Sequence, residues 1–290
     1  MRVNATMENK LRKTFQKIIR NALQEDAVYN DITSDITAKN KQVKFKIATR
    51  QDIVLCGTDI VSITFDLLKN NKKFKNSDIK FKILKKDGQK IKSRDTIAEG
   101  FGDARIIFAA ERVILNFIQH LSSISSFTNK FVTELNNKKI KILDTRKTTP
   151  GLRTLEKYAV KTGNGFNHRQ NLREMILIKD NHIAAAGGIK NALNLIAKYK
   201  KKLKVEVECD NIKQVSSAIL FNPEIIMLDN MSIEDIEKSI KIINKKAFIE
   251  VSGGINLDNI KKYRKLEIDY ISIGAITHSA PSVDIGLDLK

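Results

Sequence analysis

Cysteine is scarce in this sequence of 290 residues, and tryptophan is absent. The two cysteines, Cys56 and Cys209, lie far apart and show no CxxC spacing. Neither a disulfide framework nor a cysteine-based zinc cluster is expected, because both need several cysteines at close and regular spacing. We predict that both thiols are buried and unbridged.

Long apolar runs are also missing. No stretch approaches the ~18 apolar residues that span a bilayer, and the polar segment from Met1 to Arg20 lacks the apolar core of a secretion signal. We therefore predict a cytoplasmic protein with no membrane partner. With 42% hydrophobic residues, the chain can bury a full core, and its length favours two domains of ~150 residues each.

Acidic residues are too few to balance the basic ones, and the formal net charge is +19. Such an excess is typical of proteins that bind nucleic acid, acidic membranes or acidic small molecules. Stacking on nucleic-acid bases needs aromatic and arginine platforms, but aromatic residues make up only 6% of the chain and do not alternate with the lysines. We predict a solvated lysine-rich surface and no nucleic-acid partner.

The N-terminal part of the chain mixes helical and strand patterns. Apolar residues at helical spacing predict a helix over 7–25, and period-two alternation predicts strands within 43–49 and 79–91. Residues 103–135 return to a helical pattern, which we expect to form two helices because four serines between 122 and 126 favour a break. The pattern indicates an α+β module rather than a repeat of strand and helix.

The domain boundary is placed near residue 115. Residues 1–115 then form the first domain, and residues 116–275 form the second. The tail, 276–290, carries Pro281 and alternating apolar residues, and we expect it to return to the first domain as a strand or extended segment.

Six short apolar runs in the second domain each stop at a polar, charged or glycine residue. They are IKIL before Asp144 to Lys147, MILI before Lys179 to His182, VEV before Glu208, IIML before Asp229 and Asn230, FIEV before Ser252 to Gly254, and YISI before Gly274. Crossover helices return every strand of a parallel sheet in one direction, so all carboxyl ends meet at one face. Six units are too few for a closed eight-fold barrel, so we predict an open parallel α/β barrel with its active site at that face.

Cationic residues dominate the first two of these strand ends. Arg146 and Lys147 precede a helix start at Pro150, which Thr148 and Thr149 would cap, so that side-chain charge and the helix dipole together favour an anion. A loop that ends in His168 and Arg169, and Lys179 after the next strand, would converge on the same place. Several such groups in one pocket suggest a small polyanionic substrate. A basic surface loop is the alternative.

Carboxylates and glycines follow the later strands. Glu208 and Asp229 would hold Mg²⁺ or sugar hydroxyls, or stabilise a developing cation; the alternative is ion pairing with nearby lysines. Glu206 faces the same side of its strand as Glu208, and the pattern alone leaves the choice between them open. The glycines after the last two strands, at 253–254 and 274, suggest backbone binding of a phosphate.

The segments "AERVILN", "DTRKTTPGLRTLEKYAVKTGNGFNHR", "ILIKDNHI" and "VSGGI" together resemble those of the quinolinate phosphoribosyltransferases. The resemblance covers nearly the whole length. It implies an N-terminal α/β sandwich domain joined to an open α/β barrel. It also implies that phosphoribosyl pyrophosphate and quinolinate, with Mg²⁺, give nicotinate mononucleotide, pyrophosphate and CO₂ in NAD biosynthesis.

The resemblance also implies roles for particular residues, among them the choice of Glu208 over Glu206. It implies catalytic roles for Lys147, Glu208 and Asp229, the two carboxylates also binding Mg²⁺; quinolinate binding by Arg112, Arg146, His168, Arg169 and Lys179; and phosphate binding by Ser252, Gly253, Gly254, Gly274 and His278. Arg112 would come from a neighbouring subunit, so the active unit would be at least a homodimer.

Two positions depart from the family pattern. Ser123 stands where glycine is usual, and Asn164 interrupts what is often a run of three glycines. The nearest alternative among enzymes is the paralogue associated with molybdate transport, which shares the fold. The intact "IKDNHI" segment argues against it. A nucleic-acid-binding protein is the alternative from another class, but a lysine surplus does not explain polar residues at six strand ends.

Overall fold

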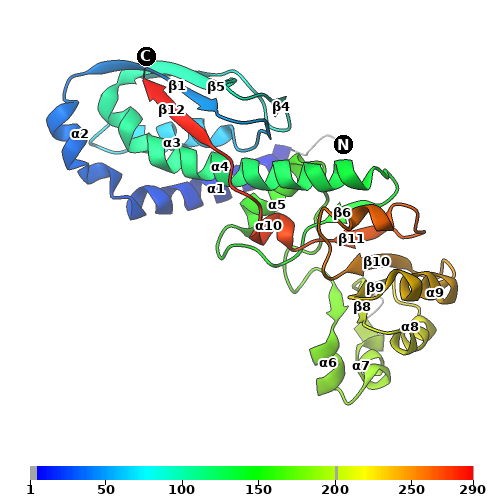
Figure 1. The fold of residues 1–290 in the computed structure, drawn as a ribbon. Coiled ribbons are helices and arrows are strands. Elements are labelled where there is room, and N and C mark those ends of the chain that lie inside the picture. Colours follow the sequence, from blue (N-terminus) through cyan, green and yellow to red (C-terminus); the bar gives the residue numbers. More distant parts are fainter. Residues whose placement is uncertain (1–4, 200–201, 290) are drawn as a thin grey trace. The chain divides into compact units, whose positions relative to one another are not determined.

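A computed structural model describes residues 5–199 and 202–289 (Figure 1). The chain divides into two compact units. The first contains the residues up to 127, residues 149–164 and the residues from 280 onward; the second contains residues 128–148 and 165–279. The division follows residue 127 of helix α4 (Ala104–Leu135), the same helix that contains residue 115, and a short internal segment joins the first unit.

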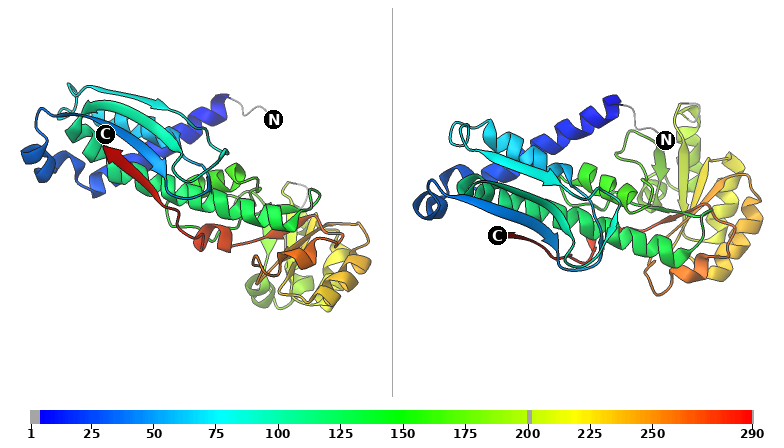
Figure 2. Two further views of the ribbon diagram at one scale, coloured as in Figure 1. Left: turned by 45° about the horizontal axis from the view of Figure 1, so that its top comes forward. Right: turned by 90° about the horizontal axis from the view of Figure 1, so that it is seen from above.

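The first unit contains a four-stranded antiparallel sheet in the order β12-β1-β5-β3. Its strands are β1 (Gln42–Thr49), β3 (Ile79–Ile83), β5 (Thr96–Asp103) and β12 (Ile285–Leu289), while β2 (Ile53–Val54) and β4 (Lys90–Ile91) form a separate pair. Alternation along β1 buries Phe45 and Ile47 on the core face. Figure 2 shows the tail strand β12 beside β1. In the antiparallel register of the two strands, Phe45 lies opposite Leu289.

The first unit also contains several helices. They are α1 (Ala5–Glu25), α2 (Ile32–Thr37), α3 (Asp59–Lys69) and α5 (Arg153–Thr162), with a 3-10 turn η1 (Val28–Asn30) after α1. The predicted helix over 7–25 is confirmed, since α1 buries Phe15, Ile19 and Leu23 and packs against α3. Phe65 of α3 stacks on Phe81 of β3 with ring centroids 5.1 Å apart, closing the core between helix and sheet.

Helix α4 (Ala104–Leu135) runs without a break, so the prediction of two helices is wrong. The serines that suggested a break bind neighbouring segments instead of capping a helix end. The backbone N–H of Cys56 donates to Ser122, and the hydroxyl of Ser125 donates to the carbonyl of Val54. Ser123, the departure from glycine, accepts a hydrogen bond from the N–H of Val283 at 3.0 Å, which ties the tail to α4.

The second unit is built on six parallel strands in the order β6-β11-β10-β9-β8-β7. They are β6 (Lys141–Leu143), β7 (Ile176–Ile178), β8 (Val205–Cys209), β9 (Ile225–Asp229), β10 (Phe248–Ser252) and β11 (Tyr270–Ser272). All six predicted strands are confirmed. Within the described residues β6 and β7 remain the two edges, so the sheet is open, as the sequence predicts.

Short helices and 3-10 turns follow the strands from β7 onward. They are α6 (Asp180–Ala185), α7 (Ile189–Ile196), α8 (Ile212–Ala218), α9 (Ile233–Ile243) and α10 (Ala275–His278), with 3-10 turns η2 (Ala197–Tyr199), η3 (Ile219–Phe221) and η4 (Ile260–Tyr263). Helices α8 and α9 lie together on one side of the strands (Figure 1). Because each crossover returns the chain in the same direction, the carboxyl ends of all six strands lie together at one end of the sheet. Among the described residues, no helix combines the length and apolar character needed to cross a membrane.

Candidate active site

A pocket of about 610 Å³ opens at the carboxyl ends of the parallel strands, and all the residues that line it belong to the second unit. It brings together nearly every residue singled out from the sequence. The lining includes Arg146, Lys147, His168, Arg169, Lys179, Glu208, Asp229, Ser252, Gly253, Gly254, Gly274 and His278. Arg112 is not among the lining residues; it is exposed on α4 of the first unit, beside a hollow of about 550 Å³.

A larger hollow of about 1050 Å³ lies at the opposite, amino ends of the strands. Its wall includes Lys139, Lys246 and Lys265 and the exposed ring of Phe248. Lysines on a surface of this charge are the ordinary solvated kind. The smaller pocket is the better candidate for chemistry, because groups of both charges converge in it from six strand ends.

Arginine makes the first part of the pocket strongly positive. Arg169 is only 8% exposed, and its guanidinium donates to the carbonyl of Met175 at 3.3 Å. Burial, and then the nearby charge of Arg146, lower the pKa of Arg169. Two guanidinium groups this close, one of them desolvated, favour a bound anion that neutralises both.

The turn after Lys147 differs from the prediction. Helix α5 begins at Arg153, and its N-cap is Leu152, which makes no side-chain capping bond. The N–H of Thr149 donates instead to the carboxylate of Glu156, at 3.2 and 3.3 Å to its two oxygens. The prediction that threonines cap a helix beginning at Pro150 is therefore wrong, because a buried glutamate from within the helix satisfies the turn.

Asp144, at the end of β6, organises the loop that carries the histidine. This fully buried carboxylate accepts hydrogen bonds from the side chain of Asn167 at 2.5 Å and from the backbone N–H of His168 at 2.9 Å. The loop also contains Asn164, whose φ of 68° lies in the left-handed region that asparagine tolerates better than most residues. Asparagine thus keeps the backbone conformation that glycine would adopt at this position.

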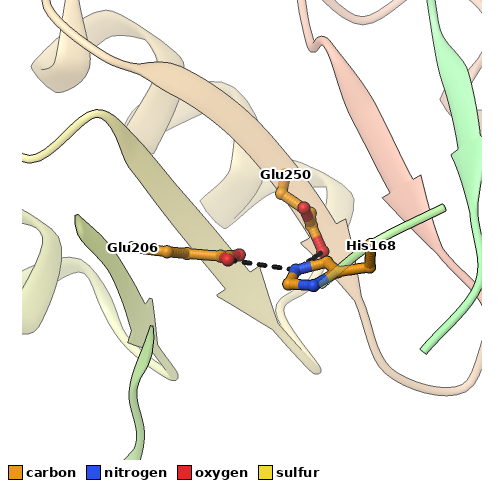
Figure 3. Close-up of side chains that lie close together, drawn as sticks. All are labelled: His168, Glu206 and Glu250. Carbon is orange, nitrogen blue, oxygen red and sulfur yellow. Dashed lines mark ion pairs between the residues drawn. The ribbon is translucent and has the colours of Figure 1, made fainter. Parts of the chain in front are cut away.

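The imidazole of His168 lies between two buried glutamates. Its Nε2 is 3.0 Å from Oε2 of Glu206 on β8 and 3.6 Å from Oε1 of Glu250 on β10. Figure 3 shows both carboxylates pointing toward the ring from two different strands. The other ring nitrogen, Nδ1, accepts a hydrogen bond from the backbone N–H of Arg169 at 2.7 Å. We call His168, Glu206 and Glu250 the buried cluster.

Both glutamates of the buried cluster are withdrawn from solvent, with 0% exposure. Burial raises the pKa of Glu206 to about 8, against the opposing charges of Arg169 and Lys179. Burial and the neighbouring Glu206 raise the pKa of Glu250 to about 8 as well, while the hydroxyl of Ser272 donates to it and opposes the rise. A carboxylate without water is stabilised by taking up a proton or by facing a cation.

Glu208 and Asp229 lie at the pocket rim, and both are less buried than the glutamates of the buried cluster. Glu208 follows Glu206 by two residues on β8 and so faces the same way, but its side chain is 13% exposed and pairs with the ammonium of Lys179. Asp229 ends the adjacent strand β9 and accepts a hydrogen bond from Asn230 at 2.6 Å. In the β8–β9 register Glu208 lies opposite Met227, which places Asp229 one step further along the same face.

Glycines bring backbone into the pocket beyond β10 and β11. Gly253 has a φ of +92°, and a Cβ there would lie 2.1 Å from Oδ1 of Asn230. A Cβ on Gly274 would lie 3.0 Å from the side chain of Lys147 and 3.2 Å from Nε2 of His278. Backbone N–H groups exposed by such close approach are suited to bind phosphate oxygens.

Sequence reasoning missed Glu250 and Ser272, and it set Glu206 aside. A signal was present, since Glu206 and Glu250 are charged residues that each lie between two buried apolar residues of a short strand. Such a residue needs a partner inside the fold. The sequence does not say which partner, because His168 reaches the cluster from a loop that follows a different strand.

Comparisons with known proteins agree with this architecture. The C-terminal domain model of the quinolinate phosphoribosyl transferases matches residues 124–288, and the N-terminal domain model matches residues 31–122. A probable nicotinate-nucleotide pyrophosphorylase [carboxylating] of Methanocaldococcus jannaschii is 40% identical over 286 residues, covering 94% of this chain and 96% of the relative.

Solved structures show the same relationship. The nicotinate-nucleotide pyrophosphorylase of Ehrlichia chaffeensis is 42% identical, with a TM-score of 0.89 over 100% of both chains. The enzyme of the same name from Francisella tularensis is 39% identical, with a TM-score of 0.88 over 96% of this chain and 97% of its own. Since both domain models match and the relatives align along nearly the whole length, the chain belongs to the quinolinate phosphoribosyltransferase family.

Proposed function

We propose that this chain transfers the phosphoribosyl group of phosphoribosyl pyrophosphate to quinolinate and removes one carboxyl group, giving nicotinate mononucleotide, pyrophosphate and CO₂. The observation that carries the proposal is the sharing of one pocket by Arg146, Arg169 and Lys179 with the carboxylates of Glu208 and Asp229. The cations suit a dicarboxylate, and the carboxylates suit a reaction centre that becomes positive.

Quinolinate would bind at the cationic side of the pocket. Arg146 and Arg169 would each pair with a carboxylate, because the planar guanidinium offers two parallel N–H groups to two oxygens. Lys179 would add a third positive charge. Its ammonium group pairs with Glu208 in the free protein and would turn in part toward the bound quinolinate. His168 would lie against the same group, with its ring held by the buried cluster.

Sugar phosphate would bind where backbone lines the pocket. The Ser252–Gly254 turn and Gly274 would present N–H groups to the 5'-phosphate, and His278 would lie near the pyrophosphate. The side chain of Lys147 runs past Gly274, and its backbone carbonyl accepts a hydrogen bond from Thr277 at 2.7 Å. This contact would hold Lys147 where negative charge develops on the leaving pyrophosphate.

The first step would form the bond between the ring nitrogen of quinolinate and the anomeric carbon while the bond to pyrophosphate breaks. Glu208 and Asp229 would offset the positive charge that develops on the ribose. In the second step the bond from the ring to the carboxyl group beside the nitrogen would break, and CO₂ would leave. Its electron pair would stay on the ring carbon next to the now cationic nitrogen, and a proton would replace the carboxyl group. No covalent bond to the protein is needed.

Glu208 and Asp229 also suit Mg²⁺. They are hard oxygen donors on adjacent strand ends, and both line the pocket. Mg²⁺ is usually held by one or two carboxylates together with substrate phosphates, and when bound it supplies neutralising charge to pyrophosphate. The residues present therefore fit the ion.

A homodimer is also part of the proposal. Arg112 is exposed on α4, as an arginine would be if it were to reach the pocket of a second copy. In that arrangement it would add one more cation to the quinolinate site. The cytoplasmic location predicted from the sequence stays a prediction.

The direct test is to incubate the purified protein with Mg²⁺, phosphoribosyl pyrophosphate and either quinolinate or nicotinate. Products would be separated by chromatography and identified by mass. Nicotinate mononucleotide from quinolinate, with an equal amount of CO₂, is the expected result. Product from nicotinate but not quinolinate, or none from either, would contradict the proposal, and the second outcome would favour the paralogue associated with molybdate transport.

A further inference from the structure

Both glutamates of the buried cluster lie too deep to touch a substrate, yet both face a residue that lines the pocket. His168 is in the pocket wall, and its side chain is 8% exposed. Glu206 and Glu250 are absent from the lining and have no exposed surface. Both carboxylates lie close to the ring of this histidine, which itself lines the pocket.

Hydrogen-bond geometry fixes which nitrogen of His168 carries hydrogen. Nδ1 lies 2.7 Å from the backbone N–H of Arg169, which is always a donor, so Nδ1 must accept. The hydrogen of the neutral ring is then on Nε2, which points between the two carboxylates. Two carboxylates from different strands therefore face the Nε2–H group.

The buried carboxylates of Glu206 and Glu250 in turn need a hydrogen-bond donor. Both oxygens of Glu206 and Oε2 of Glu250 are buried with no well-aligned hydrogen-bond donor among the described residues. Ser272 holds the other oxygen of Glu250. Buried carboxylate oxygens are costly when unsatisfied, and Nε2 of His168 lies only 3.0 Å from Oε2 of Glu206.

A metal ion held by the same three side chains fits this geometry less well. Their ligand atoms lie within 4.8 Å of one another. A metal on Nε2 would leave the hydrogen of a neutral ring on Nδ1, where metal-bound histidines normally donate to an acceptor. Here Nδ1 instead faces the N–H of Arg169, a second donor, and the two hydrogens would collide.

We propose that Glu206 and Glu250 are positioning residues: they hold the imidazole of His168 in the Nε2–H form and in one orientation. The backbone N–H of Arg169 donates a hydrogen bond to the same ring. The cluster therefore also fixes the backbone position from which the Arg169 side chain extends. The inference deepens the proposed function, on which its substrate readout rests, by extending the quinolinate site into the core.

Nuclear magnetic resonance of the free protein tests the ring directly. The chain has four histidines, so ¹⁵N-histidine labelling with long-range ¹H–¹⁵N correlation gives few signals, and loss of one set in His168→Asn assigns His168. The expected result is hydrogen on Nε2 and none on Nδ1. Hydrogen on Nδ1 alone, the form of a metal-bound ring, or on both nitrogens, would overturn the inference. No substrate is involved, so this readout is independent of the proposed function.

A pair of variants tests the consequence for binding. Glu206→Gln keeps an oxygen that accepts from Nε2, whereas Glu206→Leu removes it at similar volume. In calorimetric titrations we expect Leu to raise the Kd of quinolinate at least tenfold and Gln to raise it less than threefold, with the Kd of phosphoribosyl pyrophosphate unchanged in both. Thermal melting shows that each variant is folded.

Three results would overturn the inference: equal effects of Gln and Leu, equal weakening of both substrates, or no effect of Leu. If Glu206→Leu does not fold, the matched pair Glu250→Gln and Glu250→Leu replaces it under the same criteria. Failure of the wild-type protein to bind quinolinate contradicts the proposed function instead, and the ring readout then decides the inference alone.

Discussion

The buried cluster and the pocket rim both contain glutamate, but the glutamates differ in burial and in the residue that they contact. Glu206 and Glu208 are two residues apart on one strand and face the same way, yet Glu206 has no exposed surface while Glu208 pairs with Lys179 at the pocket. Burial raises the pKa of Glu206 to about 8 and leaves it facing a histidine. Position along the strand therefore separates Glu206, which lies against His168 in the core, from Glu208, which lines the pocket and would contact the substrate.

The difference in burial between Glu206 and Glu208 has a simple physical origin. Side chains that point into an open barrel form layers, and each step of two residues along a strand moves outward by one layer. Water reaches the outer layer and not the inner one. Glu206, in the inner layer of its strand, therefore needs a proton or a cation from the fold.

The largest expected effect is at the rim. Asp229→Asn removes a charge that would offset the developing positive charge on the ribose, and we expect kcat to fall by roughly 100- to 1000-fold. Steady-state kinetics measures it. The control is Asp210→Asn, an exposed carboxylate just past the end of β8 that is not among the pocket residues. A loss in the control as large as that in Asp229→Asn would contradict the assignment.

The second effect concerns the arginine next to the buried cluster. Arg169→Ala should raise the Kd of quinolinate by roughly ten- to 100-fold, since hydrogen bonds to charged groups contribute about 1.5–3 kcal/mol. Binding of phosphoribosyl pyrophosphate should change little. Arg173→Ala, an exposed arginine in the same loop, serves as the control. Calorimetry with each substrate distinguishes the outcomes, and equal weakening of both would count against a quinolinate pocket at this position.

The third effect tests the part of the pocket made by backbone. Gly253→Ala places a Cβ 2.1 Å from Asn230 on a backbone with a φ of +92°, and strain of this kind costs about 1–3 kcal/mol. The neighbouring Gly254 has open space around the same position, so Gly254→Ala is the matched control. We expect Gly253→Ala to weaken phosphoribosyl pyrophosphate binding and lower the Tm more than Gly254→Ala does. The reverse order would contradict a phosphate turn centred on Gly253.

The smallest effect is on stability as a function of pH. The pKa of Glu250 rises on folding from 4.5 to about 8, so the folded state holds a proton that the unfolded state has lost between these values. Its contribution to stability is thus greatest below pH 4.5 and is lost as the pH rises through about 8.

Glu250→Gln removes this dependence. Relative to the wild type, the variant should gain stability as the pH is raised from 6 to 8.5, which thermal melting at both values measures. Exposed Glu237→Gln controls for the loss of one carboxylate. A stability difference between Glu250→Gln and the wild type that stays constant with pH would show that Glu250 is not the titrating group.

Much of this arrangement is readable from the sequence. Six apolar runs that stop at polar residues predict six parallel strands with their carboxyl ends together, because strand character is local and crossover connections return each strand in the same direction. The uninterrupted α4 could not be predicted in this way. Its serines favour a break when considered alone, and only the partners that they meet, such as the carbonyl of Val54 and the N–H of Val283, show why the helix continues.

The buried cluster could be predicted only in part. A glutamate inside a buried strand indicates that a polar or charged partner lies nearby in the fold. Glu206, Glu250 and His168, however, come from segments that are far apart in the sequence. Their meeting depends on strand order, which places β8 and β10 on either side of β9. Pocket residues at strand ends are predictable from the common edge, whereas contacts between strands depend on the fold.

The central claim is that depth separates positioning from catalysis, and one measurement on a single strand tests it most directly. Glu206→Gln and Glu208→Gln make the same change two residues apart, and single-turnover rates with saturating substrates compare them. We predict that Glu208→Gln slows phosphoribosyl transfer by at least 100-fold while Glu206→Gln stays within threefold of the wild type. Equal losses in the two variants, or the larger loss at Glu206, would contradict the account.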